Sequence, residues 1–107
     1  MMEAFEVILT TNTDRPVMVS LEDYEAVAEF RWFEKRSAAI SYVARSVKRG
    51  GKVATIRLHR FIGDLVFGEQ PPTVEMHHKN RDPFDCRRSN IEALPRSEHR
   101  RLHRSIA

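Results

Sequence analysis

The chain has 107 residues, of which 41% are hydrophobic and 31% are charged, enough for one compact domain or for one domain with two lobes. No apolar stretch approaches the ~20 residues of a membrane span, and no signal peptide is visible, so we expect a cytoplasmic protein with no membrane partner. The single cysteine, Cys86, excludes an internal disulfide and a multi-cysteine zinc site.

The net charge of +3 is distributed unevenly along the chain. Residues 1–34 carry eight acidic and two basic side chains, whereas residues 35–63 carry eight basic side chains and no acidic one. A segment with only positive charge is typical of a surface that binds nucleic-acid phosphates. A solvated basic surface without a partner would have the same composition.

The N-terminal part is predicted to form a hairpin followed by a short helix. Residues 5–9 and 17–19 have the pattern of strands, and the residues between them favour turns. Ser20 is expected to cap the helix, with Asp23 at the position of a capping-box acid. The apolar face of this helix would consist of Leu21, Tyr24, Val27 and Ala28.

The basic segment predicts an antiparallel β-meander. Strands are expected to begin at residues 31–33 and to run over 39–47 and 53–58, with a glycine turn at 49–52. A short helix is then expected over residues 59–66. A two-stranded ribbon can enter the major groove of DNA or follow its phosphates. The candidate DNA contacts in this meander are Arg45, Lys48, Arg49, Lys52 and Arg57.

The last third of the chain is predicted to form a smaller unit. Its expected elements are a strand over 74–78, a polar loop over 79–89, a strand over 91–94 and a helix from Pro95 to about Ser105. The predicted fold class is α+β. A β-rich N-terminal lobe with short helices (residues 1–73) would be followed by a C-terminal ββα unit (residues 74–107).

Four of the five histidines lie in this unit at spacings that suit a metal site. His99 and His103 are four residues apart on the predicted helix, which would place both imidazoles on one face, about 6 Å apart. Adjacent strand residues point to opposite sides, so only one of His77 and His78 is expected to bind the same metal. The other is available as a base, and an Asn carbonyl beside its ring could fix its tautomer.

These residues meet the needs of phosphodiester hydrolysis. A water must lose a proton near neutral pH, which suits an imidazole. The charge that develops on the phosphate must be stabilised, which suits a metal ion with an open coordination position. The alternative is a structural zinc site, although such sites prefer four protein ligands. His59 lies outside the pattern and is expected to be structural or to contact a backbone phosphate.

Residues 74–102 resemble the HNH nucleases of the ββα-metal type. The similarity to colicin-type DNase domains rests on His77, His78, Asn90, His99 and His103. The run from Asp85 to Ile91 is similar to a stretch that is common in phage and intron-encoded (homing) HNH endonucleases. The segment from Leu58 to Ile62 also resembles the N-terminal region of those phage proteins.

The resemblance implies a metal-dependent DNA endonuclease of phage or mobile-element type, with DNA as its partner. It implies that His78 is the general base and that Asn90 orients His78 and braces the loop. The implied metal ligands are His77, His99 and His103. This all-histidine set suits one divalent ion, and Mg²⁺, Mn²⁺, Zn²⁺ and Ni²⁺ all stay open as its identity.

Further expectations concern the surroundings of this site. Arg87, Arg88 and Arg100 are expected to contact phosphates that flank the scissile bond. Cys86 stands where the family usually has Asn and is expected to be a packing residue. Two other functions stay open: a non-catalytic, metal-stabilised DNA-binding module, and a toxin-type nuclease without sequence preference. The chain is expected to act as a monomer or a homodimer.

Overall fold

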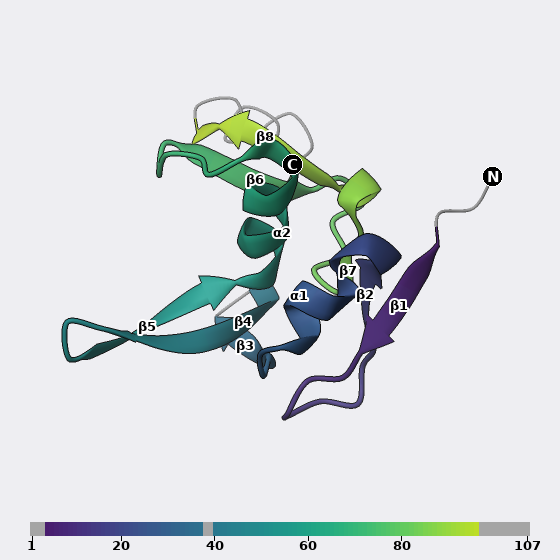
Figure 1. The fold of residues 1–107 in the computed structure, drawn as a ribbon, viewed down its shortest axis with the longest axis horizontal. Coiled ribbons are helices and arrows are strands. Elements are labelled where there is room, and N and C mark those ends of the chain that lie inside the picture. Colours follow the sequence, from purple (N-terminus) through teal and green to yellow (C-terminus); the bar gives the residue numbers. More distant parts are fainter. Residues whose placement is uncertain (1–3, 38–39, 97–107) are drawn as a thin grey trace.

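The computed structural model describes residues 4–37 and 40–96 (Figure 1). The part described is α+β, as predicted, with three small sheets around two α-helices. The predicted C-terminal helix lies outside the described residues, apart from its first two positions. In chain order the elements are β1 (Phe5–Ile8), β2 (Val17–Ser20), the 3₁₀ turn η1 (Leu21–Asp23), α1 (Tyr24–Ala28), β3 (Phe33–Ser37), β4 (Ile40–Arg49), β5 (Lys52–Arg57), α2 (Leu58–Phe67), β6 (Val74–His78), β7 (Asp85–Cys86), the 3₁₀ turn η2 (Arg88–Asn90) and β8 (Ile91–Pro95).

The N-terminal sheet contains a strand from the last third of the chain. Strands β1 and β2 form the predicted antiparallel hairpin. Strand β7 pairs with β2 in parallel, through Met18 with Asp85 and Val19 with Cys86. The prediction of loop for residues 79–89 is therefore wrong at β7 and at η2. A two-residue strand has no periodicity of its own and forms because the chain docks onto β2.

The short helix after β2 does not begin with the predicted capping box. The Ser20 side chain makes no cap bond, and its Oγ accepts a hydrogen bond from the backbone amide of Arg88 at 2.8 Å. The Asp23 carboxylate is 1% exposed and receives two hydrogen bonds from the Arg88 guanidinium at 2.7 and 2.9 Å. Leu21 is 54% exposed, so the apolar face was also wrongly placed there. Ser20 and Asp23 therefore bind Arg88 of η2 and do not cap the helix.

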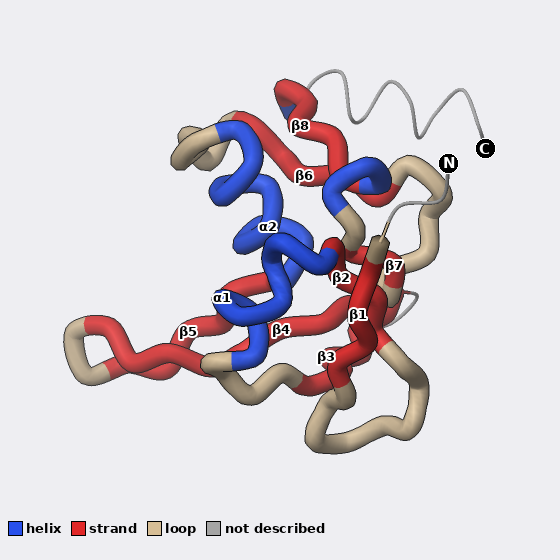
Figure 2. Tube along the Cα trace, turned by 45° about the vertical axis from the view of Figure 1, so that its right-hand side comes forward, coloured by secondary structure: helices blue, strands red, loops and turns tan. Residues whose placement is uncertain are grey.

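The basic meander forms as predicted, with β4 at the centre of an antiparallel sheet between β3 and β5. Gly50 and Gly51 have φ values of 57° and 78° between the paired residues Arg49 and Lys52. Two successive positive φ angles are the geometry of a tight two-residue hairpin turn, which glycine adopts without strain. Figures 1 and 2 show the β4–β5 hairpin extending away from the rest of the molecule.

Helix α2 connects the basic sheet to the β6–β8 hairpin. It ends at Gly68, where φ is 80°. Gly63 is buried against β6, and a Cβ atom at this position would overlap the sulfur of Met76. The Arg60 guanidinium donates hydrogen bonds to the backbone carbonyls of Val74 and Gln70. The helix is thus held close to the strand that carries His77 and His78.

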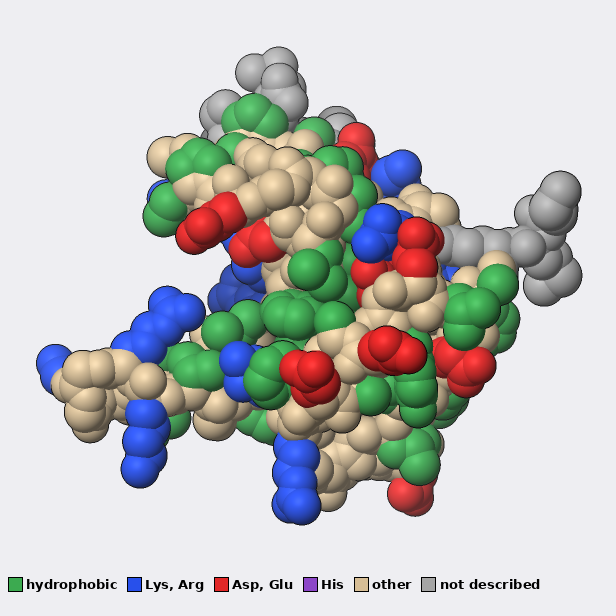
Figure 3. Space-filling model, in the orientation of Figure 1, with side chains coloured by type: hydrophobic (Ala, Val, Ile, Leu, Met, Phe, Trp, Pro, Cys, Tyr) green, Lys and Arg blue, Asp and Glu red, His purple; other side chains and the backbone are tan. Residues whose placement is uncertain are grey.

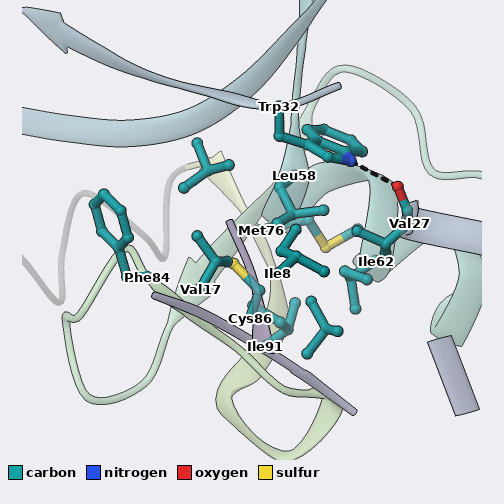
Figure 4. Close-up of a cluster of buried hydrophobic side chains, with 12 residues drawn as sticks. Ile8, Val17, Val27, Trp32, Leu58, Ile62, Met76, Phe84, Cys86 and Ile91 are labelled. Atoms are coloured by element: carbon teal, nitrogen blue, oxygen red, sulfur yellow. Dashed lines mark hydrogen bonds between the residues drawn. The ribbon is translucent and has the colours of Figure 1, made fainter. Parts of the chain in front are cut away.

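One hydrophobic core joins all three sheets and both helices (Figure 4). Trp32 is 2% exposed, and its indole Nε1 donates a hydrogen bond to the carbonyl of Val27 at 2.8 Å. The core lies on both sides of the predicted lobe boundary at residue 73. Its members are Ile8, Val17, Val19, Val27, Trp32, Val43, Leu58, Ile62, Met76, Phe84, Cys86 and Ile91.

Candidate active site

Strand β6 presents His77 and His78 at its end, where it pairs with β8. His78 is opposite Ile91 and His77 is opposite Glu92. Side chains of a strand alternate between its faces, so His78 shares the face of buried Met76, and His77 lies on the other face with Glu92. The two adjacent histidines therefore have different surroundings, which fits the different roles expected for them.

His78 is enclosed by two side chains from other elements. Its ring centroid lies 4.5 Å from that of His59 on α2, with the two rings tilted by 48°. Its Nε2 atom lies 3.7 Å from the sulfur of Cys86 on β7. The pKa of His78 is lowered from 6.5 to about 4, mainly by burial and then by the nearby His77, while Asp82 and Asp85 oppose the shift. At neutral pH the imidazole is uncharged and can accept a proton.

His59 is a residue of the candidate site that the sequence pattern did not identify. It is the second residue of α2, and it meets His78 because this helix packs on β6 and β8. No spacing rule connects residues that lie 19 positions apart on a helix and a strand. The resemblance of residues 58–62 to the phage proteins was the one available signal, and it carried no role for this histidine.

Asn90 braces the loop between β6 and β8. Its Nδ2 donates to the Oδ1 of Asn80 at 2.9 Å and to the carbonyl of Asp85 at 2.7 Å, and its Oδ1 accepts from the Asn80 amide at 3.0 Å. Asn90 was expected to brace this loop, and these hydrogen bonds connect it to Asn80 and Asp85 of the loop. Among residues 4–37 and 40–96 it makes no hydrogen bond to His78, and the polar atom at Nε2 of that ring is the sulfur of Cys86.

Two of the predicted phosphate-binding arginines have buried carboxylate partners. Arg87 makes two hydrogen bonds to Asp85, at 2.7 and 2.8 Å, which hold the pKa of that carboxyl below its ordinary value. Arg88 is paired with Asp23 across the two parts of the chain. Their side chains are 29% and 33% exposed, so each has a structural contact and a partly accessible head group. DNA contact by either residue stays a prediction.

The metal site is only partly inside the described structure. Of the three expected ligands, His77 is described, whereas His99 and His103, together with Arg100, lie outside the described residues. Within residues 4–37 and 40–96, no cluster of three or more His, Cys, Asp or Glu side chains could hold a metal ion.

The basic side chains of the meander fall into two groups. Arg45 stacks on Phe30, with its guanidinium carbon 3.7 Å from the ring centroid, and Arg57 lies 4.8 Å over the ring of Tyr42. The second group is exposed near the end of the β4–β5 hairpin and consists of Lys48, Arg49 and Lys52. Figure 3 shows Lys and Arg side chains projecting from this hairpin, whereas Asp and Glu side chains lie over the other parts of the same face.

No helix in the described part of the chain is both long enough and apolar enough to cross a membrane.

One family model matches a segment in the C-terminal part of the chain. Residues 57–101 match the family model described as HNH endonuclease. No curated protein and no solved structure matches the chain. The matched segment contains the described His59, His77, His78 and Asn90, together with α2, β6 and β8. The segment that surrounds His78 is thus similar to the HNH endonucleases.

Proposed function

We propose that the protein is a metal-dependent DNA endonuclease in which His78 is the general base. The observation that carries this proposal is an uncharged, partly buried imidazole at the end of β6, inside a segment that matches the HNH endonucleases. A base must be unprotonated at the working pH before it can take a proton from water. His78 meets this condition throughout the neutral range.

The residues around His78 have separable tasks in this reaction. His78 accepts the proton of the attacking water, while the Asn90 network keeps β6 and β8 in register at the site. A divalent ion held by His77, His99 and His103 would supply charge stabilisation at the scissile phosphate. Cleavage that leaves a 5′-phosphate is the outcome that the family resemblance implies.

The β4–β5 hairpin is the proposed DNA-binding element. Its exposed Lys48, Arg49 and Lys52 belong to a 29-residue segment without any acidic side chain. A two-stranded ribbon fits the major groove of duplex DNA, which is about 12 Å wide. Phosphate contacts made by lysine and arginine position a protein on DNA and make its affinity depend on salt. The phage or homing type of the enzyme is proposed from the sequence resemblance alone.

A plasmid-nicking assay tests the proposed activity. The full chain is incubated with supercoiled DNA and Mg²⁺, Mn²⁺, Zn²⁺ or Ni²⁺, or with EDTA. We expect metal-dependent nicking, and a rate that His78→Ala lowers about 100-fold or more, because general-base catalysis contributes about that much. Glu69→Ala is the control, since this exposed residue lies on the connection between α2 and β6, outside the strands of both hairpins.

Two results would contradict the proposal. Cleavage by His78→Ala at the wild-type rate would remove His78 as the base. DNA binding without cleavage in every metal would instead favour the non-catalytic binding module. Once cleavage is seen, mapping of the cut sites separates a homing-type specificity from a toxin-type nuclease that cuts anywhere.

A further inference from the structure

Cys86 occupies a defined position between His78 and the loop that precedes β7. The residue is fully buried. Its sulfur lies 3.7 Å from Nε2 of His78 and 3.5 Å from the carbonyl oxygen of Pro83. In the part of the chain that is described, this sulfur is the only hydrogen-bond partner of the His78 ring. The thiol is therefore in a position to decide which ring nitrogen of His78 carries the proton.

The hydrogens of this group have two possible arrangements, since the Cys86 thiol could donate to Nε2 of His78 or to the Pro83 carbonyl. The Pro83 carbonyl can only accept a hydrogen bond, and a thiol has one hydrogen to give. Burial raises the pKa of the Cys86 thiol, so the sulfur keeps that hydrogen. With the S–H directed to Pro83, the lone pairs of sulfur face Nε2. An imidazole N–H is a better donor than a thiol, so the favoured arrangement runs from Nε2–H to sulfur and from S–H to the carbonyl.

We propose that Cys86 is a positioning residue for His78, because its sulfur accepts the Nε2–H of the imidazole and so holds Nδ1 unprotonated. Nδ1 is then the atom that takes the proton from water, a step that rests on the proposed nuclease function. The tautomer itself does not depend on that function. A hydrogen bond to the other ring nitrogen commonly fixes the tautomer and the ring orientation of a functional histidine.

The surrounding structure holds the sulfur in place. Cys86 pairs with Val19 in the parallel β2–β7 ladder. The carbonyl of the preceding Asp85 accepts a hydrogen bond from Asn90. His59 packs against the His78 ring and restricts its rotation. Asn90 therefore acts on His78 through the strand that carries Cys86, rather than by the direct contact that the sequence predicted.

The tautomer can be read directly by nuclear magnetic resonance. Long-range ¹H–¹⁵N spectra of the full-length, ¹⁵N-histidine-labelled protein are recorded at pH 7.5 without added metal. We expect His78 to show a protonated Nε2 and a bare Nδ1. Cys86→Ser should keep this pattern, because a hydroxyl can also accept from Nε2–H and donate to Pro83. Cys86→Val fills the space without an acceptor and should lose the preference for one tautomer.

Cleavage kinetics supply the second readout. Cys86→Val should lower kcat about tenfold with KM unchanged, as expected for loss of a contact that orients a functional histidine. Cys86→Ser should restore most of kcat, and thermal unfolding confirms that both variants are folded. A wild-type ring protonated at Nδ1, or a Cys86→Val variant with unchanged tautomer and kcat, would overturn the proposal. If no variant cuts DNA, the nuclease function fails while the spectra still decide the role of Cys86.

Discussion

At the scale of single residues, burial makes His78 sensitive to the folded state. Its pKa is about 4 in the folded protein and returns to the ordinary 6.5 when the chain unfolds. Between these values the unfolded chain binds a proton more readily than the folded one. The contribution of His78 to stability is therefore fully present above pH 6.5 and is lost as the pH falls toward 4.

This linkage predicts a difference between the wild type and His78→Gln, which does not titrate. Between pH 7.5 and pH 5, the free energy of unfolding of the wild type should fall by about 2 kcal/mol more than that of the variant. Urea unfolding in the presence of EDTA at both pH values measures the difference. Equal losses in the two proteins would mean that His78 is not desolvated in the fold.

The residues of the candidate site differ in how far the sequence could identify them. His77, His78 and Asn90 could be singled out because residue type and spacing carry the chemistry. The contacts that His59 and Cys86 make with His78 could not, because they depend on how α2 and β7 pack around β6. The pattern of charges along the sequence also does not predict that Arg88 pairs with the buried Asp23, which lies 65 positions earlier.

At the scale of elements, local signals predicted those structures that form from local interactions. The β4–β5 hairpin was predicted correctly because a Gly-Gly turn lies between alternating strands. Strand β7 was missed because its two residues become a strand only by pairing with β2. The helix cap at Ser20 failed for the same reason, since a distant backbone amide uses the hydroxyl.

The hairpin also allows a test of its proposed contact with DNA. Replacing Lys48 and Lys52 with Gln removes two exposed positive charges without touching the core. Each lost phosphate contact should reduce the dependence of log affinity on log salt by about 0.9, so the slope should become shallower by about 2. Fluorescence anisotropy with a labelled duplex at several salt concentrations measures the slope.

A charge-matched variant provides the control for this experiment. Arg31→Gln combined with Arg36→Gln also removes two exposed charges, both outside the β4–β5 hairpin. Its salt slope should stay close to that of the wild type. Equal changes in the two double variants would mean that net charge, and not this hairpin, determines DNA affinity.

At the scale of the whole molecule, the α+β class and the order of most elements followed from periodicity and turn residues. The manner in which the first 73 residues join the rest did not. That junction is built from the β2–β7 ladder, the shared core and the pair between Asp23 and Arg88. The β2–β7 ladder and the Asp23–Arg88 pair connect residues more than 60 positions apart, and no local pattern encodes such a partnership.

This junction predicts that the chain unfolds as one cooperative unit. Trp32 reports on the N-terminal part by fluorescence, and the His78 ring signal reports on the β6–β8 hairpin; both should change at the same urea concentration. Asp23→Asn should lower the stability by about 1–3 kcal/mol, because it removes the buried carboxylate that pairs with Arg88. The transitions should still coincide if the core and β7 dominate the coupling.

The exposed neighbour of Asp23 gives the matched control. The Glu22 carboxylate lies 3.5 Å from the same guanidinium but is 62% exposed, so Glu22→Gln should change stability by less than about 1 kcal/mol. Equal effects of the two substitutions would show that burial of Asp23 adds nothing. Separate transitions for Trp32 and His78 in the wild type would show two lobes that unfold independently. Unfolding of the N-terminal lobe would then release β7 from β2, and His78 would lose its contact with Cys86, which lies on β7.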